Sequence, residues 1–316
     1  MKSPFKEFDP TQFKRYWLDV PYANQHSRQV MDIWLPDEGE GPFPLIVFVH
    51  GGGWLFGNKR ENTMPGAFKV MSQGYAMASI SYRLAPGSHW PEPLYDVRAA
   101  IRFLRAHSAE YNLKADKIAV MANSAGGHLS GMVAALAGRD ILKGKELGNP
   151  DVDDSIQCLV NLFSPSDLIA CDYCDLGAVA MTASGDGNTV IDCDEQDPMQ
   201  KPHNIHLGFR ALDNPAAAAG ASPINFVTPD FPRAYFLQGL KDTLVPAGQS
   251  ISMWRKVNLV CGDGHARLEI FPNAVHGDPA MKTDEVMNRI LDFIDDCLWD
   301  GPRRRTPLPT ELKLVD

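Results

Sequence analysis

A serine between a short buried strand and a helix is the feature that most restricts what this chain can fold into. Residues 117–121 (KIAVM) are an apolar run typical of a buried strand, and residues 125–136 have helical spacing and no proline. Ser124 stands between them, in the sequence ANSAG. A serine among small residues at a strand-to-helix junction indicates a nucleophile elbow, a tight turn that carries the hydroxyl out of the sheet. The pattern alone also fits a serine that caps a buried helix, because Ala122 stands where the elbow normally begins with glycine.

The sequence HGGGW at 50–54 supports the elbow interpretation. It follows LIVFV at 45–49, an apolar run that predicts a strand buried on both faces, as parallel sheets require. Three consecutive glycines indicate a backbone that adopts unusual angles or approaches another group closely. Amide N–H groups without side chains in the way can stabilise negative charge on a carbonyl oxygen, as in an oxyanion hole. A phosphate loop is disfavoured, because neither GxGxxG nor a Gly-Lys-Ser/Thr ending is present.

A serine nucleophile needs a histidine base and an acid, and α/β-hydrolases carry them in the chain order Ser, Asp, His. His276 follows the apolar alternation at 268–271, so it is expected in a loop after a late strand, where a base can reach the serine. Asp242 follows the apolar run at 234–239, and a carboxylate there can accept the imidazole Nδ1–H. The alternative for Asp242 is an ordinary turn or helix-capping aspartate.

Three nearby residues compete for these roles. His265 precedes the last strand and is expected at the opposite edge of the sheet. His128 lies in the same helix as Ser124 and is expected to pack behind the elbow. Asp278 is the neighbouring acid that could replace Asp242 as the partner of the histidine.

Together these motifs resemble those of α/β-hydrolase esterases, in particular the hormone-sensitive-lipase group and the bifunctional feruloyl and acetyl-xylan esterase-like enzymes. The resemblance covers roughly residues 28–298 with a gap in the middle. It rests on HGGGW (50–54), SYRLAP (81–86), SAGGHL (124–129), SPIN (222–225) and the residues Gly239, Asp242, Val245 and Pro246.

The resemblance implies a fold and a set of site residues. The fold is that of the α/β-hydrolases, and the triad is Ser124, Asp242 and His276. The residues implied for the oxyanion hole, through their backbone amides, are Gly52, Gly53 and Ala125. Ala122 is a departure from the family pattern at the first position of the elbow.

The order of elements along the chain leads to the same fold class. Strands are expected at 30–35, 45–49, 76–81, 117–122, 157–163, 234–239 and 267–271, the first of them antiparallel and partly exposed. Apolar spacing predicts helices around 94–104 and 286–297. Alternating strands and helices predict a mostly parallel central sheet with helices on both faces.

We expect residues 1–316 to form a single domain with one insertion. The stretch between Ser164 and Ser222 is too long for an ordinary connection. We therefore expect residues 167–221 to form a cap over the carboxyl edge of the sheet, where ligands bind in such folds.

The same stretch contains a candidate metal motif. Cys171 and Cys174 form a C-x-x-C, followed by Cys193, His203 and His206. This spacing permits a zinc site, but a single C-x-x-C is a weak signal, and a solvated loop is the default interpretation. No metal or organic cofactor is expected.

Composition narrows the classes of partner. A net charge of −9 argues against nucleic acid or an anionic membrane as partner. The basic run at 303–305 lies between prolines and is expected to be a solvated terminus. No stretch is apolar enough to span a membrane, and the N-terminus lacks the apolar core of a secretory signal, so a cytoplasmic location is expected. The oligomeric state is left open, a homo-oligomer included.

The function expected from these features is that of a serine carboxylesterase. Its substrates are expected to be short-chain acyl esters, acetyl first and feruloyl second, of a carbohydrate or aryl alcohol, because the inserted stretch is polar and holds no long apolar segment. Two alternatives remain. The first is an arylformamidase or amidase that uses the same triad, and the second is a non-catalytic binding protein with this fold.

Overall fold

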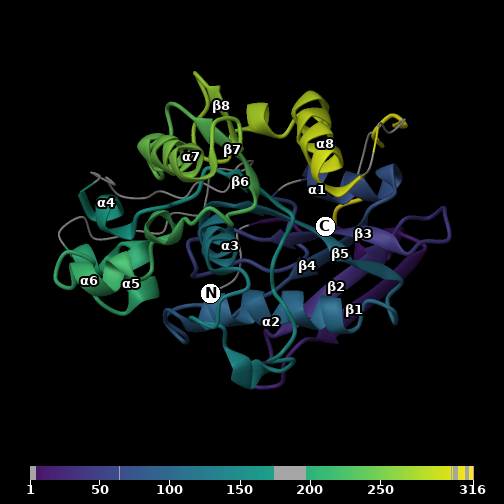
Figure 1. Cartoon of the computed structure of the whole chain (residues 1–316), viewed down its shortest axis with the longest axis horizontal. Helices are drawn as coiled ribbons and strands as arrows, with labels where there is room; N and C mark the ends of the chain where they lie inside the picture. The colour runs from purple at the N-terminus through teal and green to yellow at the C-terminus, as the bar shows by residue number, and fades with distance from the viewer. Residues whose placement is uncertain are drawn as a thin grey trace.

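The computed structural model describes residues 5–63, 65–173, 197–299, 301, 305–309 and 313–315. Within these residues eight strands form one twisted sheet in the order β1-β2-β4-β3-β5-β6-β7-β8 (Figure 1). β2 pairs antiparallel with β1 and with β4, and all other pairs are parallel. The strands are β1 Arg15–Pro21, β2 Val30–Leu35, β3 Phe43–Val49, β4 Ala76–Ile80, β5 Leu113–Asn123, β6 Cys158–Leu162, β7 Arg233–Gly239 and β8 Ala266–Phe271.

Helices connect most of the parallel strands. The α-helices are α1 Pro65–Lys69, α2 Glu92–Ala106, α3 Ser124–Leu136, α4 Leu168–Tyr173, α5 Pro202–Leu207, α6 Pro215–Ala219, α7 Gly248–Cys261 and α8 Asp284–Leu298. Short 3₁₀ helices are Pro10–Gln12, Val70–Gln73, Lys145–Leu147, Pro198–Gln200, Pro223–Phe226 and Pro279–Met281. None of the helices in the described ranges is long and apolar enough to cross a membrane.

Successive side chains of a strand point to opposite faces of the sheet, and both faces of this sheet are covered. Leu45, Val47 and Val49 of β3 belong to a core shared with α2, α3 and α7. Ile46 and Phe48 belong to a second core shared with α1 and α8. The expected mostly parallel sheet with helices on both faces is therefore confirmed.

One expectation about the edge of the sheet is wrong. The strand at 30–35 is antiparallel as expected, but it is neither the first strand nor partly exposed: β1 lies outside it, and residues 31–35 are buried. β1 escapes sequence analysis because its sequence RYWLDVP has no clear alternation, most of its side chains are exposed, and its register shifts between Trp17 and Val20. Such a bulge is common at a sheet edge.

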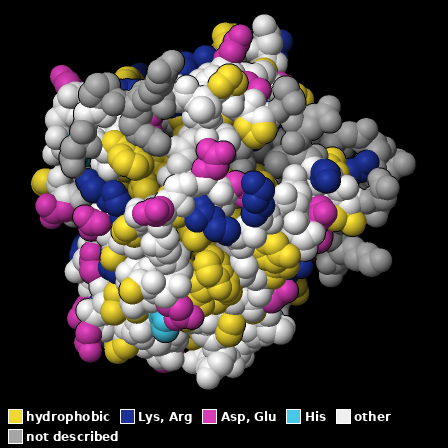
Figure 2. Space-filling view, turned by 90° about the vertical axis from the view of Figure 1, so that its right-hand side faces the viewer, with side chains coloured by type: hydrophobic (Ala, Val, Ile, Leu, Met, Phe, Trp, Pro, Cys, Tyr) yellow, Lys and Arg dark blue, Asp and Glu magenta, His cyan; other side chains and the backbone are white. Residues whose placement is uncertain are grey.

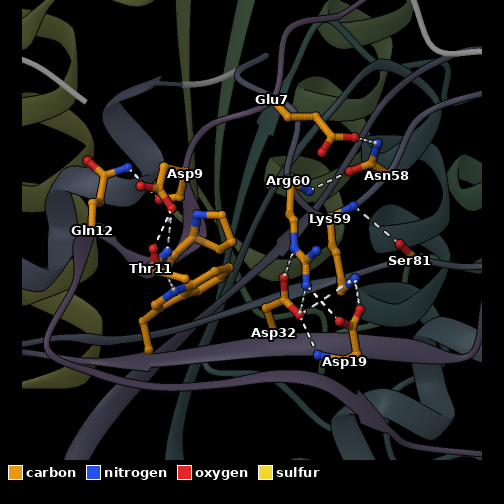
Figure 3. Close-up of polar contacts among 12 residues, drawn as sticks. Glu7, Asp9, Thr11, Gln12, Asp19, Asp32, Asn58, Lys59, Arg60 and Ser81 are labelled. Atoms are coloured by element: carbon orange, nitrogen blue, oxygen red, sulfur yellow. Dashed lines mark hydrogen bonds and ion pairs between the residues drawn. The ribbon is translucent and has the colours of Figure 1, made fainter. Parts of the chain in front are cut away.

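A buried ion-pair network fastens the loop after the HGGGW sequence to β2 (Figure 3). Asp32 of β2 is wholly buried, and its Oδ2 accepts a 2.6 Å hydrogen bond from Arg60 Nε. Lys59 Nζ lies 3.6 Å from Asp32 Oδ1 and 2.6 Å from the carboxylate of Asp19. The loop that carries the three glycines is thus tied to the sheet by charge as well as by packing.

Arg305 is the residue of the basic run at 303–305 that the structure describes. Arg305 forms ion pairs of 2.7 Å with Asp292 and 2.6 Å with Asp295 on α8, so the expectation of a solvated terminus is wrong for this residue. Residues 303 and 304 lie outside the described residues. Figure 2 shows that on one face of the molecule Lys and Arg side chains lie among Asp and Glu side chains and do not form a continuous basic surface.

Replacing Asp32 by Ala should lower the free energy of unfolding by about 3 kcal/mol, because Arg60 would lose its 2.6 Å partner and the largely buried cations Arg60 and Lys59 would keep only the exposed carboxylate of Asp19. Urea denaturation followed by circular dichroism measures this. The matched control is Asp296→Ala, which removes a 2.9 Å pair with Arg267 between two exposed side chains. It should cost less than about 1 kcal/mol. Equal losses in the two variants would contradict the structural role given to Asp32.

Candidate active site

Ser124 lies at a sharp turn between β5 and α3. It is the first residue of α3, its φ is +50°, and it is 8% exposed. A positive φ is uncommon for a residue with a side chain and is retained where the surrounding structure holds it in place. Ala122, the departure from the elbow pattern, is buried in β5 and paired with Val49 of β3, so its methyl group is accommodated within the sheet.

The glycines after the serine allow this turn. A Cβ atom at Gly126 would overlap the carbonyl oxygens of Val49 and His50 at the end of β3. A Cβ atom at Gly127 would overlap the hydroxyl of Ser164, which follows β6. The first turn of α3 can therefore lie directly against the ends of both neighbouring strands, and the serine is held at the carboxyl edge of the sheet.

His276 and Asp242 come to the same edge from the loops after β8 and β7. The Oγ of Ser124 lies 3.0 Å from His276 Nε2, and His276 Nδ1 lies 2.7 Å from Asp242 Oδ2. The His276 ring also packs edge-on against Phe163, with ring centroids 4.7 Å apart. The structure thus brings the three residues expected from the sequence into one hydrogen-bonded chain.

The Asp242 carboxylate is held from several sides. Its Oδ1 accepts the N–H groups of Leu244 at 2.9 Å and Val245 at 2.8 Å, as a turn aspartate does. Its Oδ2 accepts a 3.2 Å hydrogen bond from Gln238 Nε2 in addition to that from His276. The two interpretations of Asp242 are therefore compatible, because one oxygen serves the turn and the other faces the histidine.

Gln238 was not identified from the sequence. Its amide orientation is set by Ser250, whose hydroxyl donates to Gln238 Oε1 at 2.8 Å. A polar side chain at the end of the apolar run 234–237 was the available signal, because a buried amide in a central strand needs hydrogen-bond partners.

The competing residues lie elsewhere. Asp278 accepts the N–H groups of Val275 and Ala280, so its carboxylate serves its own turn. His265 donates to the carbonyl of Phe231, before β7, at the opposite edge of the sheet. His128 is buried behind the elbow and donates to the carbonyl of Ala221; burial lowers its pKa to about 4. The expectations for His265 and His128 are confirmed.

The loop after β3 presents backbone N–H groups near the elbow. Gly52 has a φ of +105° and Gly53 a φ of +58°, and neither N–H donates to any acceptor in the described part of the chain. A Cβ atom at Gly52 would overlap the carbonyl of Phe56. The N–H of Ala125, in the first turn of α3, lacks an intrahelical partner by geometry. All three amides expected to form an oxyanion hole therefore have donor capacity to spare.

His50 holds this loop from behind. Its Nδ1–H donates to the carbonyl of Gly51 at 2.7 Å, and its ring stacks on Tyr82 with centroids 4.3 Å apart. Burial lowers its pKa to about 3, so the ring is neutral at physiological pH and adds no charge to the site.

A pocket of about 40 Å³ opens beside the serine. Its lining joins the glycine loop, the elbow and the loop after β7 to the segment between β6 and β7: Gly53, Trp54, Ser124, Pro165, Cys171, Pro202, His203, Leu244 and Val245. Of the pocket residues from the inserted segment, Cys171 and His203 were considered from the sequence only as possible zinc ligands, and Pro202 had no signal.

The inserted segment contacts the glycine loop through aromatic rings. Figure 1 shows α4, α5 and α6 gathered at one side of the molecule. His206 of α5 stacks on Trp54 with centroids 4.7 Å apart, and His128 of α3 packs edge-on against His206 at 5.7 Å. His203 instead faces Asp172. The zinc hypothesis on this segment stays a prediction, because Cys174 and Cys193 lie outside the described residues.

A family model described as BD-FAE matches residues 31–257. The matched range contains Ser124 and Asp242 and ends before His276. Similar curated proteins include Esterase LipQ of Mycobacterium tuberculosis, which is 28% identical over 236 residues, 73% of this chain and 50% of that protein. Esterase LipC of the same organism is 29% identical over 250 residues, 79% of this chain and 57% of its own length. The chain spans about half the length of the curated relatives that it matches.

Solved structures of esterases have the same fold. A truncated form of a carbohydrate esterase from gut microbiota superposes with a TM-score of 0.76 at 23% identity, covering 92% of this chain and 99% of that one. An acetyl ester-xyloside bifunctional hydrolase from Caldicellulosiruptor lactoaceticus gives 0.66 at 21% identity, covering 90% and 97%. These similarities confirm the expected α/β-hydrolase fold. With the family model matching most of its length, the chain belongs to the BD-FAE family.

Proposed function

We propose that this protein is a serine carboxylic ester hydrolase that acts through Ser124, His276 and Asp242. The observation that carries the proposal is the hydrogen-bonded chain from Ser124 Oγ through the His276 ring to Asp242 Oδ2, with distances of 3.0 Å and 2.7 Å. An imidazole with a carboxylate on Nδ1 and a hydroxyl on Nε2 is arranged as a general base for that hydroxyl. The names of the relatives, which are esterases and an ester hydrolase, support the same activity.

The mechanism follows from the positions of these groups. His276 takes the proton of Ser124 as the hydroxyl attacks the ester carbonyl, and Asp242 stabilises the imidazolium that forms. The amides of Gly52, Gly53 and Ala125 donate to the oxyanion, each worth on the order of 3 kcal/mol in comparable sites. His276 then protonates the leaving alkoxide. Water next attacks the acyl-enzyme with His276 as base, and the acid is released.

The substrate class follows from the pocket beside the serine. Because the leaving oxygen must meet His276, the acyl group lies on the side away from that residue. The 40 Å³ pocket touches Ser124 and Gly53 and does not include His276 among its lining residues. We therefore assign it to the acyl group, and its size favours short chains, with acetyl first; a feruloyl group would need more room.

We also propose that residues 167–221 act as a cap on this site. Three residues of that stretch, Cys171, Pro202 and His203, contribute to the pocket lining. A carbohydrate or aryl alcohol as leaving group agrees with the carbohydrate esterase and acetyl ester-xyloside hydrolase among the structural neighbours.

Two alternative functions remain. One is an enzyme that cleaves an amide bond, and the other is a binding protein that catalyses no reaction. An arylformamidase or amidase would use the same three residues, and rates on an acetate ester and the matching acetanilide, measured side by side, separate the two classes. A non-catalytic binding protein would not need the hydrogen-bonded chain at Ser124, and the intact chain argues against it.

Replacing Ser124 by Ala should lower kcat on p-nitrophenyl acetate by about 10⁴-fold or more, because the acyl-enzyme can no longer form. The control is Ser130→Ala in the same helix. Ser130 is also buried, and its hydroxyl has no hydrogen-bond partner among the described residues. It should retain activity within a few fold. Activity of the Ser124 variant within about tenfold of that of the parent protein would contradict the assignment of Ser124 as the nucleophile.

Replacing His276 by Ala should be nearly as damaging as losing the serine, since the two residues act as a unit. Asp242→Asn should retain more activity, with a loss on the order of 10²–10⁴ in kcat, because the base is still present but wrongly oriented. Asp278→Asn is the matched control and should change kcat little. A larger loss in the Asp278 variant than in the Asp242 variant would reverse the choice of acid.

Acyl chain length gives an independent check of the pocket assignment. Among p-nitrophenyl esters, kcat/KM for acetate and butyrate should exceed that for palmitate by more than about tenfold, because the pocket beside the serine is small. Steady-state rates below the micelle concentration of the long ester measure this. A maximum at ten or more acyl carbons would exclude a short-chain esterase.

A further inference from the structure

His203 is a pocket residue that the triad chemistry does not use. It lies in α5, is 3% exposed, and lines the pocket together with Ser124 and Gly53. The residue therefore faces the acyl group in the proposed function, on which the inference below depends.

The His203 ring is oriented by a buried carboxylate. Its Nε2 lies 3.4 Å from Oδ1 of Asp172, whose side chain is 1% exposed. Asn204 Nδ2 donates to the same oxygen at 3.1 Å, and Arg210 Nε donates to Asp172 Oδ2 at 3.2 Å. Lys201 Nζ lies 3.6 Å away. The hydrogen bond from His203, followed by that from Asn204 and the nearby cations, holds the pKa of Asp172 well below its usual range, so the carboxylate is ionised.

The tautomer of His203 follows from this partner. Burial lowers the pKa of His203, so the ring is neutral at physiological pH. An ionised carboxylate only accepts, and Nε2 must therefore carry the ring proton. Nδ1 is then left as an acceptor with a lone pair. This nitrogen makes no hydrogen bond to the described residues, so its lone pair is open to a molecule in the pocket that the ring lines.

An acceptor that lines the acyl pocket can receive a hydrogen bond from a donor on the acyl chain. An acetyl or butyryl group has none, whereas a hydroxyl on the acyl chain would supply one. Of the three residues that the inserted segment contributes to the pocket, Cys171, Pro202 and His203, the histidine is the one whose side chain has a nitrogen acceptor. The small pocket suits a short acyl chain such as the CH(OH)CH₃ of a lactyl group, which has three heavy atoms beyond the carbonyl.

We propose that His203 Nδ1 accepts a hydrogen bond from a hydroxyl group on the acyl chain of the substrate, and that the enzyme selects short hydroxyacyl esters over unsubstituted esters of the same length. His203 is thus a specificity-determining residue, and Asp172 is a positioning residue that fixes its tautomer. The acyl transfer itself is unchanged.

The test compares ethyl lactate with ethyl propionate, which share the alcohol and differ by one hydroxyl in place of hydrogen. A pH-stat records the acid released from each lactate enantiomer and from propionate. We use the ratio of kcat/KM for lactate to that for propionate, because a change in this ratio between variants cancels the intrinsic reactivity of the two esters. His203→Phe should lower the ratio for the preferred enantiomer about tenfold and leave propionate hydrolysis within a few fold.

Two further variants separate hydrogen bonding from shape. The amide of His203→Asn can place an acceptor oxygen near the position of Nδ1, whereas His203→Gln places its amide near the position of Nε2. Asn should therefore retain most of the preference, and Gln should lose it. His107→Asn, at the exposed end of α2, is the matched control and should leave the ratio unchanged.

The outcomes distinguish the two levels of the argument. Hydrolysis of both esters with a ratio that is the same in the parent protein and in the Phe and Gln variants would overturn the role of His203 and leave the esterase proposal intact. Hydrolysis of neither ester, with Ser124→Ala indistinguishable from the parent protein on p-nitrophenyl acetate, would contradict the esterase proposal, and the role of His203 would fall with it.

Discussion

The close approach of α3 to the ends of β3 and β6 is the constraint on which the site depends. Glycine at 126 lets the helix backbone lie against the carbonyls of Val49 and His50, where any side chain would overlap them. Ser124 therefore lies against the glycine loop that follows β3. A Cβ atom at Gly51 would lie 3.1 Å from that of Ser124, so the loop also needs a small residue at the contact. Close packing of backbone segments therefore holds Ser124 beside the amides of the glycine loop.

The site and the adjoining pocket each contain a histidine paired with a buried aspartate. The ring nitrogen that the carboxylate contacts determines which nitrogen of each histidine remains available. Asp242 lies on Nδ1 of His276 and leaves Nε2 for the serine. Asp172 lies on Nε2 of His203 and leaves Nδ1 without a protein partner among the described residues. The same two side-chain types therefore give a base for the nucleophile in one case and a fixed acceptor in the other. Burial lowers the pKa of His203, so its ring is a weaker base than a free imidazole.

Sequence patterns predict the central part of this molecule well, because that part obeys local rules. The buried parallel strands read as continuous apolar runs, and the order of Ser124, Asp242 and His276 along the chain follows from the order of strands. Chain order also favoured Asp242 over Asp278, which local spacing could not decide. The edge strand β1 was missed because its exposed side chains give no alternation and its register is broken. Gln238 was missed and His203 was considered only as a possible zinc ligand, because their contacts depend on partners distant in the sequence, Ser250 and Asp172.

The pocket wall is built from two different parts of the fold. Gly53, Ser124 and Val245 follow strands of the central sheet, where hydrogen-bond ladders and two cores restrict movement. Cys171, Pro202 and His203 belong to the segment between β6 and β7, which rests on the glycine loop through the stacked rings of His206 and Trp54. Substitutions in that segment can reshape the acyl pocket without changing the distances among the three reacting side chains. A chain built in this way can keep one chemistry while its substrate preference changes, since the groups that select the acyl chain are anchored separately from those that attack it.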